Sequence, residues 1–262
     1  MASRQPAGSA PIGFSSCSNA NTTFNALTTR RPRRTKPSWC RFCGRKVEAA
    51  LEAYLPAVRG GRVLDVGCGR QPFRPWLEAR GFHYVGLDVE QNPEGTVEVI
   101  CEIDQPLPEG LLAGEPFDFI LCLEVLEHVA DWEATFANFA RLLRPGARAL
   151  ITCPHFYMLH LEPHDFWRPT PYAFQYFAAR HGFTVMFQKT AGDGWDILGT
   201  LLASGYPQPV GRSLVNRLVN RAYWWVHRSL LWGLRSRQLQ SRVRWQSRFT
   251  FYMSNIVVLE KS

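Results

Sequence analysis

The chain has 262 residues, of which 46% are hydrophobic and 20% are charged, so it is long enough for one globular domain with extensions. No run reaches the roughly 18 uncharged apolar residues that a membrane-spanning helix needs, which excludes a polytopic membrane protein. Seven cysteines at scattered spacings argue against a disulfide scaffold and favour a reducing compartment.

The net charge of +8 is distributed unevenly along the chain. Residues 1–47 carry nine Lys/Arg and no acid, and residues 197–259 carry nine Arg and no acid. Residues 48–196, by contrast, have a net charge of −10. An acidic central region therefore lies between two basic flanks, and the net charge of the whole chain describes neither the central region nor the flanks.

We predict that residues 1–44 form a disordered basic extension, because this segment is rich in small and polar residues and has little apolar periodicity. It lacks the apolar core of a secretory signal, although its acid-free composition is compatible with an organelle transit peptide. Cys40 and Cys43 have the spacing of zinc ligands, but no second pair completes a set of four. We therefore expect no metal.

From Arg45 onward, apolar residues recur at helical spacing until Gly60 and Gly61. Beyond that point strand-like apolar runs alternate with helical stretches. The predicted strands are 62–66, 84–88, 97–101, 117–123, 148–153, 184–188 and 255–259, and the predicted helices are 73–80, 132–143 and 171–181. Thr170 is the expected N-cap of the last of these helices. Strands that alternate with helices predict an α/β fold with a doubly wound parallel sheet.

The first predicted strand leads directly into a glycine-rich turn. Gly67 and Gly69 stand where a strand turns sharply into a helix and the backbone can approach a ligand. A dinucleotide-binding fingerprint would have a third glycine at position 72, where this chain has Pro72. The pattern therefore predicts a nucleotide-like ligand and disfavours NAD.

Acidic residues follow the first four predicted strands in order, namely Asp65, Asp88, Glu102 and Glu124. Asp88 lies 19 residues after Gly69, where a carboxylate can accept both hydrogen bonds of a ribose diol. Each acid alone would suit a solvated turn, but four in succession at strand ends indicate a binding edge.

Four segments together resemble a known family: VLDVGCG (63–69), YVGLDV (84–89), FDFILCLEVLEHV (117–129) and LLRPGARALITCPHF (142–156). They look like class I S-adenosylmethionine-dependent methyltransferases, most closely the ubiquinone-type and glycan-biosynthesis-associated branch, over about residues 45–190. The resemblance implies a Rossmann-like seven-stranded sheet with helices on both faces and a helical insertion before the last strand. The methyltransferase domain would then span residues 45–262.

The resemblance also implies the residues that contact the cofactor, S-adenosylmethionine. Asp65 and Gly67 would lie by its methionine end, Asp88 would bind the ribose, and Ile103 would offer its N–H to adenine. Glu102 falls where the family usually has Asp. The full implied set is Asp65, Gly67, Cys68, Gly69, Asp88, Glu102, Ile103 and Leu123.

The segment after the fifth main strand, residues 154–170, is dense in ionisable and aromatic side chains. Because an alcohol or phenol acceptor benefits from a general base, the acceptor-side candidates are His155, His160, His164 and Asp165. The alternative is that these residues only hold the loop together, with Arg168 paired to Asp165. For His128, a structural role is the favoured interpretation.

Residues 195–248 form a long basic insertion with five of the nine tryptophans. Arg217, Arg221 and Arg228 fall on one helical stripe, and a basic amphipathic helix with Trp and Leu can lie in a membrane interface. The alternative is a structural cap with arginines facing solvent. No RNA-binding motif accompanies the charge, so no nucleic-acid partner is expected.

These features predict an enzyme that methylates a hydroxyl group of a small-molecule, glycan or lipid-linked acceptor. We expect it to be cytoplasmic and able to associate with an anionic membrane. Two alternatives stay open at this point: an NAD-type Rossmann oxidoreductase, and a non-catalytic protein that uses the fold for cofactor binding or interaction.

Overall fold

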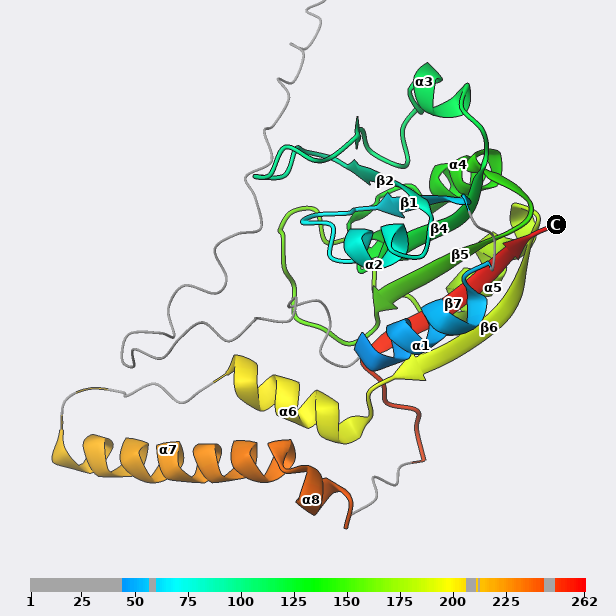
Figure 1. Ribbon diagram of the computed structural model, residues 1–262. Helices are drawn as coiled ribbons and strands as arrows, with labels where there is room; N and C mark the ends of the chain where they lie inside the picture. The colour runs from blue at the N-terminus through cyan, green and yellow to red at the C-terminus, as the bar shows by residue number, and fades with distance from the viewer. Residues whose placement is uncertain (1–43, 57–59, 206–210, 212, 243–247) are drawn as a thin grey trace, which may run out of the picture. The chain divides into compact units, whose positions relative to one another are not determined.

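The computed structural model describes residues 44–262 except 57–59, 206–210, 212 and 243–247 (Figure 1). The predicted extension, apart from Gly44, and the Cys40–Cys43 pair lie outside the described residues. The first helix, α1, spans Gly44–Tyr54. It ends before the predicted stop at Gly60, because Pro56 has no N–H and disfavours helical backbone at the residue before it.

The described residues form a seven-stranded sheet in the order β3-β2-β1-β4-β5-β7-β6. All neighbouring strands pair in parallel except β7, which runs antiparallel to both β5 and β6. The predicted seven-stranded Rossmann-like sheet is therefore confirmed. The strands are β1 Arg62–Val66, β2 His83–Asp88, β3 Val99–Ile100, β4 Phe117–Leu123, β5 Leu143–Pro154, β6 Phe183–Ala191 and β7 Ser254–Lys261.

Helices cover both faces of this sheet, because successive residues of the strands point to opposite sides. One core packs Phe136 of α4 and Phe174 of α5 against one face, and the other packs Leu51 of α1 and Leu77 of α2 against the opposite face. The remaining bounds are α2 Arg74–Glu78, α3 Glu109–Leu112, the 3-10 turn η1 Leu126–His128, α4 Trp132–Leu142 and α5 Pro171–Arg180. Thr170 is the N-cap residue of α5, but its side chain makes no capping hydrogen bond.

The insertion before the last strand is helical, as predicted. It contains α6 Gly194–Ser204, α7 Leu214–Arg235 and α8 Arg237–Gln240. Asp193 and Asp196 form a capping box at the start of α6, in which each side chain accepts a hydrogen bond from the other residue's backbone N–H. Among the described residues, no helix combines the length and the apolar character needed to cross a membrane.

Candidate active site

The loops after four parallel strands meet at one edge of the sheet. Strands β1, β2, β4 and β5 are parallel, so their carboxyl ends lie on the same edge. The chain order reverses between β1 and β4, and open α/β sheets bind ligands at such a reversal. Every residue that the sequence assigned to the site belongs to these strand ends, to the loops that follow them, or to the loop after the parallel strand β3.

The two loop glycines are required for different reasons. Gly67 has φ +68°, and a Cβ added there would lie 2.3 Å from Cγ2 of Val125, so close packing excludes any side chain. Gly69 has φ +49°, and no atom lies within 4 Å of the position that a Cβ would take. The backbone at Gly69 therefore borders open space, as a loop that admits a ligand requires.

Asp88 ties the end of β2 to this loop. Its Oδ2 accepts a hydrogen bond from the N–H of Gly69 at 2.8 Å, and its Oδ1 accepts one from the N–H of Val89 at 2.8 Å. A carboxylate has about four acceptor positions, so each oxygen keeps a lone pair for a further donor. Asp88 can thus hold the glycine loop and still receive the two hydroxyl groups of a ribose.

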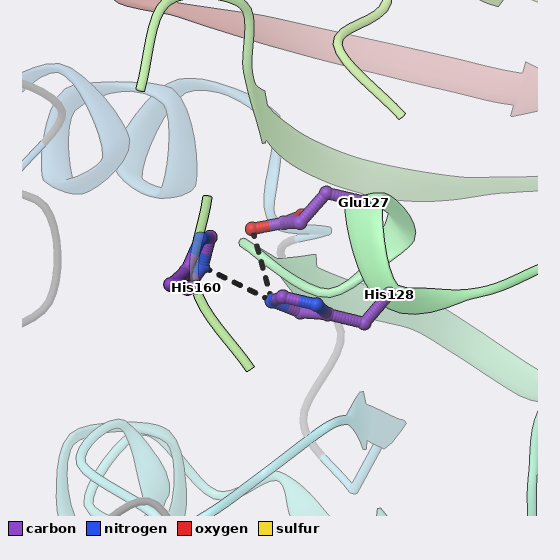
Figure 2. Close-up of side chains that lie close together, drawn as sticks. All are labelled: Glu127, His128 and His160. Atoms are coloured by element: carbon purple, nitrogen blue, oxygen red, sulfur yellow. Dashed lines mark hydrogen bonds and ion pairs between the residues drawn. The ribbon is translucent and has the colours of Figure 1, made fainter. Parts of the chain in front are cut away.

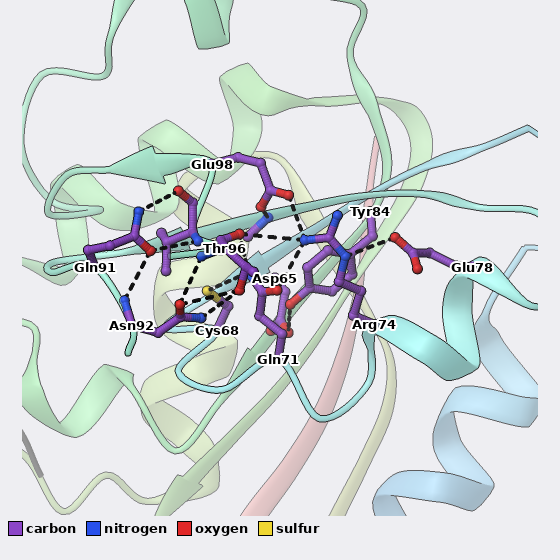
Figure 3. Close-up of polar contacts among 12 residues, drawn as sticks. Asp65, Cys68, Gln71, Arg74, Glu78, Tyr84, Gln91, Asn92, Thr96 and Glu98 are labelled. Atoms are coloured by element: carbon purple, nitrogen blue, oxygen red, sulfur yellow. Dashed lines mark hydrogen bonds and ion pairs between the residues drawn. The ribbon is translucent and has the colours of Figure 1, made fainter. Parts of the chain in front are cut away.

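A buried polar network fixes the outer side of the glycine loop (Figure 3). Asn92 donates from Nδ2 to the carbonyl of Gly69 at 2.9 Å and accepts from the N–H of Thr96 at 2.9 Å. Gln71 donates from Nε2 to the carbonyl of Thr96 at 2.8 Å. These bonds join the turn after β2 to the loop after β1, so the Gly69 backbone is preorganised.

Asp65, near the end of β1, is buried and accepts a hydrogen bond from the Tyr84 hydroxyl at 2.6 Å. Burial raises the pKa of Asp65 to about 7; the Tyr84 bond opposes this, and the nearby Asp88 adds to it. A cation beside this carboxyl would lower its pKa and so favour the ionised form. Asp65 therefore suits the amine or sulfonium of the predicted cofactor.

The other predicted cofactor residues lie along the same edge. Ile103 is buried, and its carbonyl accepts a hydrogen bond from Asn138 Nδ2 at 2.8 Å, which fixes the backbone after β3. Glu102 beside it is exposed, and Leu123 ends β4 in a partly buried position. Their contact with a cofactor stays a prediction, as it does for Gly67, Cys68 and Gly69.

A half-buried glutamate and a buried one, Glu124 and Glu127, follow β4. Glu124 has φ +56°, donates its N–H to the Thr152 carbonyl at 3.0 Å, and accepts from the Ser254 hydroxyl at 3.0 Å. Burial raises the pKa of Glu124, and hydrogen bonds to the side chains of Thr152 and Ser254 oppose this shift. Glu127 is 1% exposed, and both burial and the neighbouring Glu124 raise its pKa well above the ordinary value. Its Oε2 has no hydrogen-bond partner in the described part of the chain.

The segment from Pro154 to Thr170 packs on the η1 turn that carries Glu127. The backbone N–H groups of Phe166 and Trp167 donate to the Glu127 carbonyl at 2.8 and 3.2 Å. The Trp167 indole donates to the carbonyl of Val129 at 2.9 Å. These bonds bring the segment after β5 against the turn after β4; Trp167 and Val129, for example, lie 38 residues apart in the sequence.

Asp165 organises this segment from within. Its side chain is 1% exposed and accepts two bonds from Arg168, at 2.7 and 2.6 Å, and one from the N–H of His160 at 2.9 Å. Burial alone would raise its pKa, but the Arg168 and His160 bonds outweigh it and lower the pKa to about 2. A carboxylate this weakly basic suits a positioning role better than proton transfer at neutral pH.

His128 and His160 face each other across the two segments (Figure 2). Their Nε2 atoms are 3.1 Å apart, and Glu127 Oε1 lies 3.7 Å from Nε2 of His128. Burial lowers the pKa of His128; the His164 carbonyl opposes this shift and His160 adds to it. Sequence reasoning favoured a structural role for His128, since only the fold brings it to His160, and it overlooked Glu127.

The other two predicted histidines have different surroundings. His155 stacks on Tyr252, with ring centroids 4.3 Å apart, and its Nδ1 lies 3.0 Å from the Pro169 carbonyl oxygen. His164 contributes its carbonyl oxygen to His128 Nδ1 at 2.8 Å. The structure thus joins His160, Asp165 and the backbone of His164 to His128, whereas His155 packs against the β7 side of the site.

The Glu127, His128 and His160 side chains also offer ligand atoms that all lie within 4.8 Å of one another. One carboxylate and two imidazoles form a donor set that zinc accepts. The arrangement is therefore compatible with a divalent cation as well as with a shared proton. The expectation that the protein needs no metal stays a prediction.

The fold and the edge loops define a nucleotide-binding α/β protein of the Rossmann-like type, and comparison with known proteins narrows the class. A family model described as "Methyltransferase domain" matches residues 34–192, which is more than half of the chain. The chain therefore belongs to this methyltransferase family. The predicted methyltransferase class is confirmed, and the predicted cofactor, S-adenosylmethionine, is consistent with it.

Curated relatives resemble only part of the chain. A ubiquinone biosynthesis O-methyltransferase from Aeromonas salmonicida is 32% identical over 102 residues, which are 36% of this chain and 43% of that protein. One from Hahella chejuensis is 36% identical over 100 residues, 35% of this chain and 42% of that protein. The chain thus spans less than half the length of these relatives.

Among solved structures, an S-adenosylmethionine-dependent methyltransferase from Archaeoglobus fulgidus has the same fold. Its TM-score is 0.51 at 16% identity, and the match covers 83% of this chain and 94% of that one. The [4+2]-cyclase SpnF matches with a TM-score of 0.50 at 13% identity, covering 83% and 80% of the two chains. At such identities the likeness concerns the fold alone.

Proposed function

We propose that this enzyme transfers a methyl group from S-adenosylmethionine to a hydroxyl group of a small organic acceptor, such as a glycan or a lipid-linked sugar. The observation that carries the proposal is the contact between His128 and His160, which lies at the carboxyl ends of β4 and β5. We propose a cytoplasmic location, with access to a membrane surface for a lipid-linked acceptor.

The residues at the edge of β1 and β2 fit the cofactor. Bound S-adenosylmethionine supplies an electrophilic methyl group on a sulfonium. Asp88 retains acceptor capacity for the ribose hydroxyls, Gly69 leaves open space beside the backbone, and Asp65 offers a carboxyl to a cation. Ile103 and Glu102 would line the adenine side, and Gly67, Cys68 and Leu123 would complete the wall.

The hydrogen-bond partners of the histidine pair determine where its protons lie. The Nδ1 of His128 faces the carbonyl oxygen of His164, so this nitrogen carries a proton. The Nδ1 of His160 lies 3.3 Å from both the Met158 carbonyl and the Asp165 carboxylate, so it carries one too. When both rings are neutral, two Nε2 lone pairs therefore face each other at 3.1 Å.

Opposed lone pairs repel, and one proton placed between them removes the repulsion. The pair can therefore take up one proton, which the two Nε2 atoms share. In the proposed reaction the O–CH₃ bond would form as the carbon–sulfur bond of the sulfonium breaks and its electron pair stays on sulfur, and the proton of the acceptor O–H would pass to Nε2 of the pair. Asp165 and Arg168 hold His160 in place for this step.

The acceptor class rests on this base and on the relatives. The curated proteins that match this chain are named as O-methyltransferases, which supports oxygen as the methylated atom. His155 and His164 lie in the same segment and would shape the acceptor side of the site.

Transfer of a labelled methyl group from S-adenosylmethionine into fractionated cell extract tests the proposal. We expect label in small molecules or lipids, in ether linkage that resists mild base. Label confined to protein or nucleic acid would refute the acceptor class. Calorimetry with S-adenosylhomocysteine serves as the second arm: binding without any methyl transfer would favour a non-catalytic protein, and binding of NADH instead would favour an oxidoreductase.

A further inference from the structure

Helix α7 contacts α6 through a side that carries His227. The His227 ring donates from Nε2 to the carbonyl oxygens of Leu202 and Gly205, at 2.6 and 2.9 Å. Asn216 and Asn220 lie on the same side, about three and two helical turns before His227, and are partly buried. Leu231 and Leu234 continue this side and are also partly buried, so it is mixed in polarity, and the longest run of apolar residues on α7 lies elsewhere.

The opposite side of α7 is apolar and exposed. Leu214, Leu218 and Trp232 are 75%, 68% and 70% exposed. With 3.6 residues per turn, one continuous face carries Leu214, Val215, Leu218, Val219, Trp225, Val226, Leu230 and Trp232. We call these eight residues the α7 apolar face. A patch this large on a protein surface marks an interaction site.

Arginines border the α7 apolar face along one edge. Arg217, Arg221 and Arg228 lie on a single stripe and are all exposed. Arg228 also lies over the Trp224 ring, 5.1 Å from its centroid. Residues 197–259 contain no acidic residue that could neutralise the stripe. The helix therefore combines apolar surface, interfacial tryptophans and uncompensated positive charge.

We propose that the α7 apolar face docks on an anionic lipid bilayer, with the helix lying along the surface. Leu, Val and Trp side chains insert at the headgroup boundary, and the arginine stripe meets the anionic lipids. The chain's own residues 1–47 are a poorer occupant, because nine basic residues without an acid would repel the stripe. A second copy is disfavoured similarly, since it would bring another arginine stripe.

This docking deepens the proposed function, since it would carry the enzyme to a lipid-linked acceptor, but its test requires neither cofactor nor acceptor. The full chain is sedimented with phosphatidylcholine vesicles that contain or lack phosphatidylglycerol. We expect binding to the anionic vesicles that weakens as salt rises. The double variant Arg217→Glu, Arg221→Glu should bind at least about 30-fold more weakly, because each lost basic residue removes a factor of about five and each added carboxylate is repelled by the anionic surface.

A matched control reverses the same number of charges elsewhere. Arg141 and Lys189 are exposed residues of α4 and β6, and the variant Arg141→Glu, Lys189→Glu should bind vesicles like the wild type. Trp225→Ser, Trp232→Ser should lose binding even at low salt, with an unchanged far-ultraviolet circular dichroism spectrum.

Three outcomes would overturn the docking proposal: wild-type protein that stays in solution with anionic vesicles, equal binding by the two charge-reversal variants, or a dimer in which the α7 apolar face is covered. If the protein fails to bind vesicles yet methylates a hydroxyl compound, the docking is wrong and the proposed function stands. If the protein binds vesicles but transfers no methyl group to any fraction, the proposed function is wrong and the docking proposal stands.

Discussion

The carboxylate of Asp88 accepts a hydrogen bond from the backbone N–H of Gly69 at 2.8 Å, and this bond joins the end of β2 to the loop after β1. One side chain thereby shapes the glycine loop and presents lone pairs to the space beside it. Because both strand ends depend on this bond, cofactor affinity and loop order are coupled at Asp88.

Asp88→Ala should therefore weaken S-adenosylhomocysteine binding about 100-fold. The carboxylate is expected to accept two hydrogen bonds from the ribose, each contributing roughly 1.5–3 kcal/mol, and hydrogen bonds to water replace this contribution in part when the side chain is removed. Calorimetry measures the change. Glu94→Ala is the matched control, because Glu94 is an exposed acid in the same loop region with only a 3.7 Å contact to Arg70. Equal affinities of the Asp88 and Glu94 variants would contradict the ribose assignment.

The two loop glycines should respond differently to alanine. Gly67→Ala places a Cβ against Val125 at a positive φ, and we expect a loss of about 2–4 kcal/mol in unfolding free energy. Gly69→Ala meets no atom, so the smaller cost of about 1 kcal/mol comes from its φ. Its larger effect should be on cofactor affinity. Urea unfolding and calorimetry separate the two quantities.

Val125→Ala provides the control for this comparison. Combined with Gly67→Ala it removes the clashing methyl groups, so the double variant should recover part of the stability that the single variant loses. If Gly67→Ala alone is as stable as the wild type, the packing explanation is wrong.

The sheet was predictable because its strands are buried on both faces and are almost continuously apolar. Strand 117–123 was predicted with the bounds that it has. Strand β5 begins at Leu143 rather than Arg148, since its first residues pair with Phe117 before the register shifts. Helix α6 was not predicted as an element, although Asp193 and Asp196, three residues apart, were a capping-box signal.

The site was only partly predictable. The motif resemblance predicted the residues on the cofactor side of the site, because these residues lie at or just after successive strand ends and follow one another in the sequence. The contact between His128 and His160 depends on how the 154–170 segment packs on η1, through bonds to the Glu127 carbonyl. No local periodicity encodes that packing, and so neither the histidine pair nor buried Glu127 could be inferred from spacing.

Asp65 should make stability depend on pH. Its pKa rises from an ordinary 3.8 to about 7 on folding, so the folded state holds a proton that the unfolded state releases. Stability is therefore lost as pH rises from about 4 to 7, by up to about 4 kcal/mol. Asp65→Asn, which can still accept from Tyr84, should be more stable than the wild type at pH 8 and similar at pH 4.

Urea unfolding at both pH values measures this difference, with Glu94→Gln as an exposed-acid control that should show no such change. A wild type and an Asp65→Asn variant with parallel pH profiles would show that Asp65 is already ionised in the folded protein.

Substitution of either member of the histidine pair should slow methyl transfer without weakening cofactor binding. We expect His128→Ala and His160→Ala each to lower kcat about 10²- to 10⁴-fold, because general base catalysis contributes that much. The double variant should be little slower than either single one, since the two rings accept one proton together. His83→Ala, an exposed histidine at the opposite end of β2, is the control and should keep full activity.

The pH dependence of kcat distinguishes this role from a structural one. The pair must be unprotonated to accept a proton, so activity falls as pH drops through its pKa. Burial lowers the pKa of His128, the hydrogen bond to the His164 carbonyl opposes this shift, and the neighbouring His160 adds to it. We therefore expect the acid limb of the kcat profile below the ordinary histidine pKa of 6.5. Loss of His160 should shift that limb, and added imidazole should restore part of kcat in His160→Ala. A limb that stays in place in both variants would assign the proton acceptor to another group.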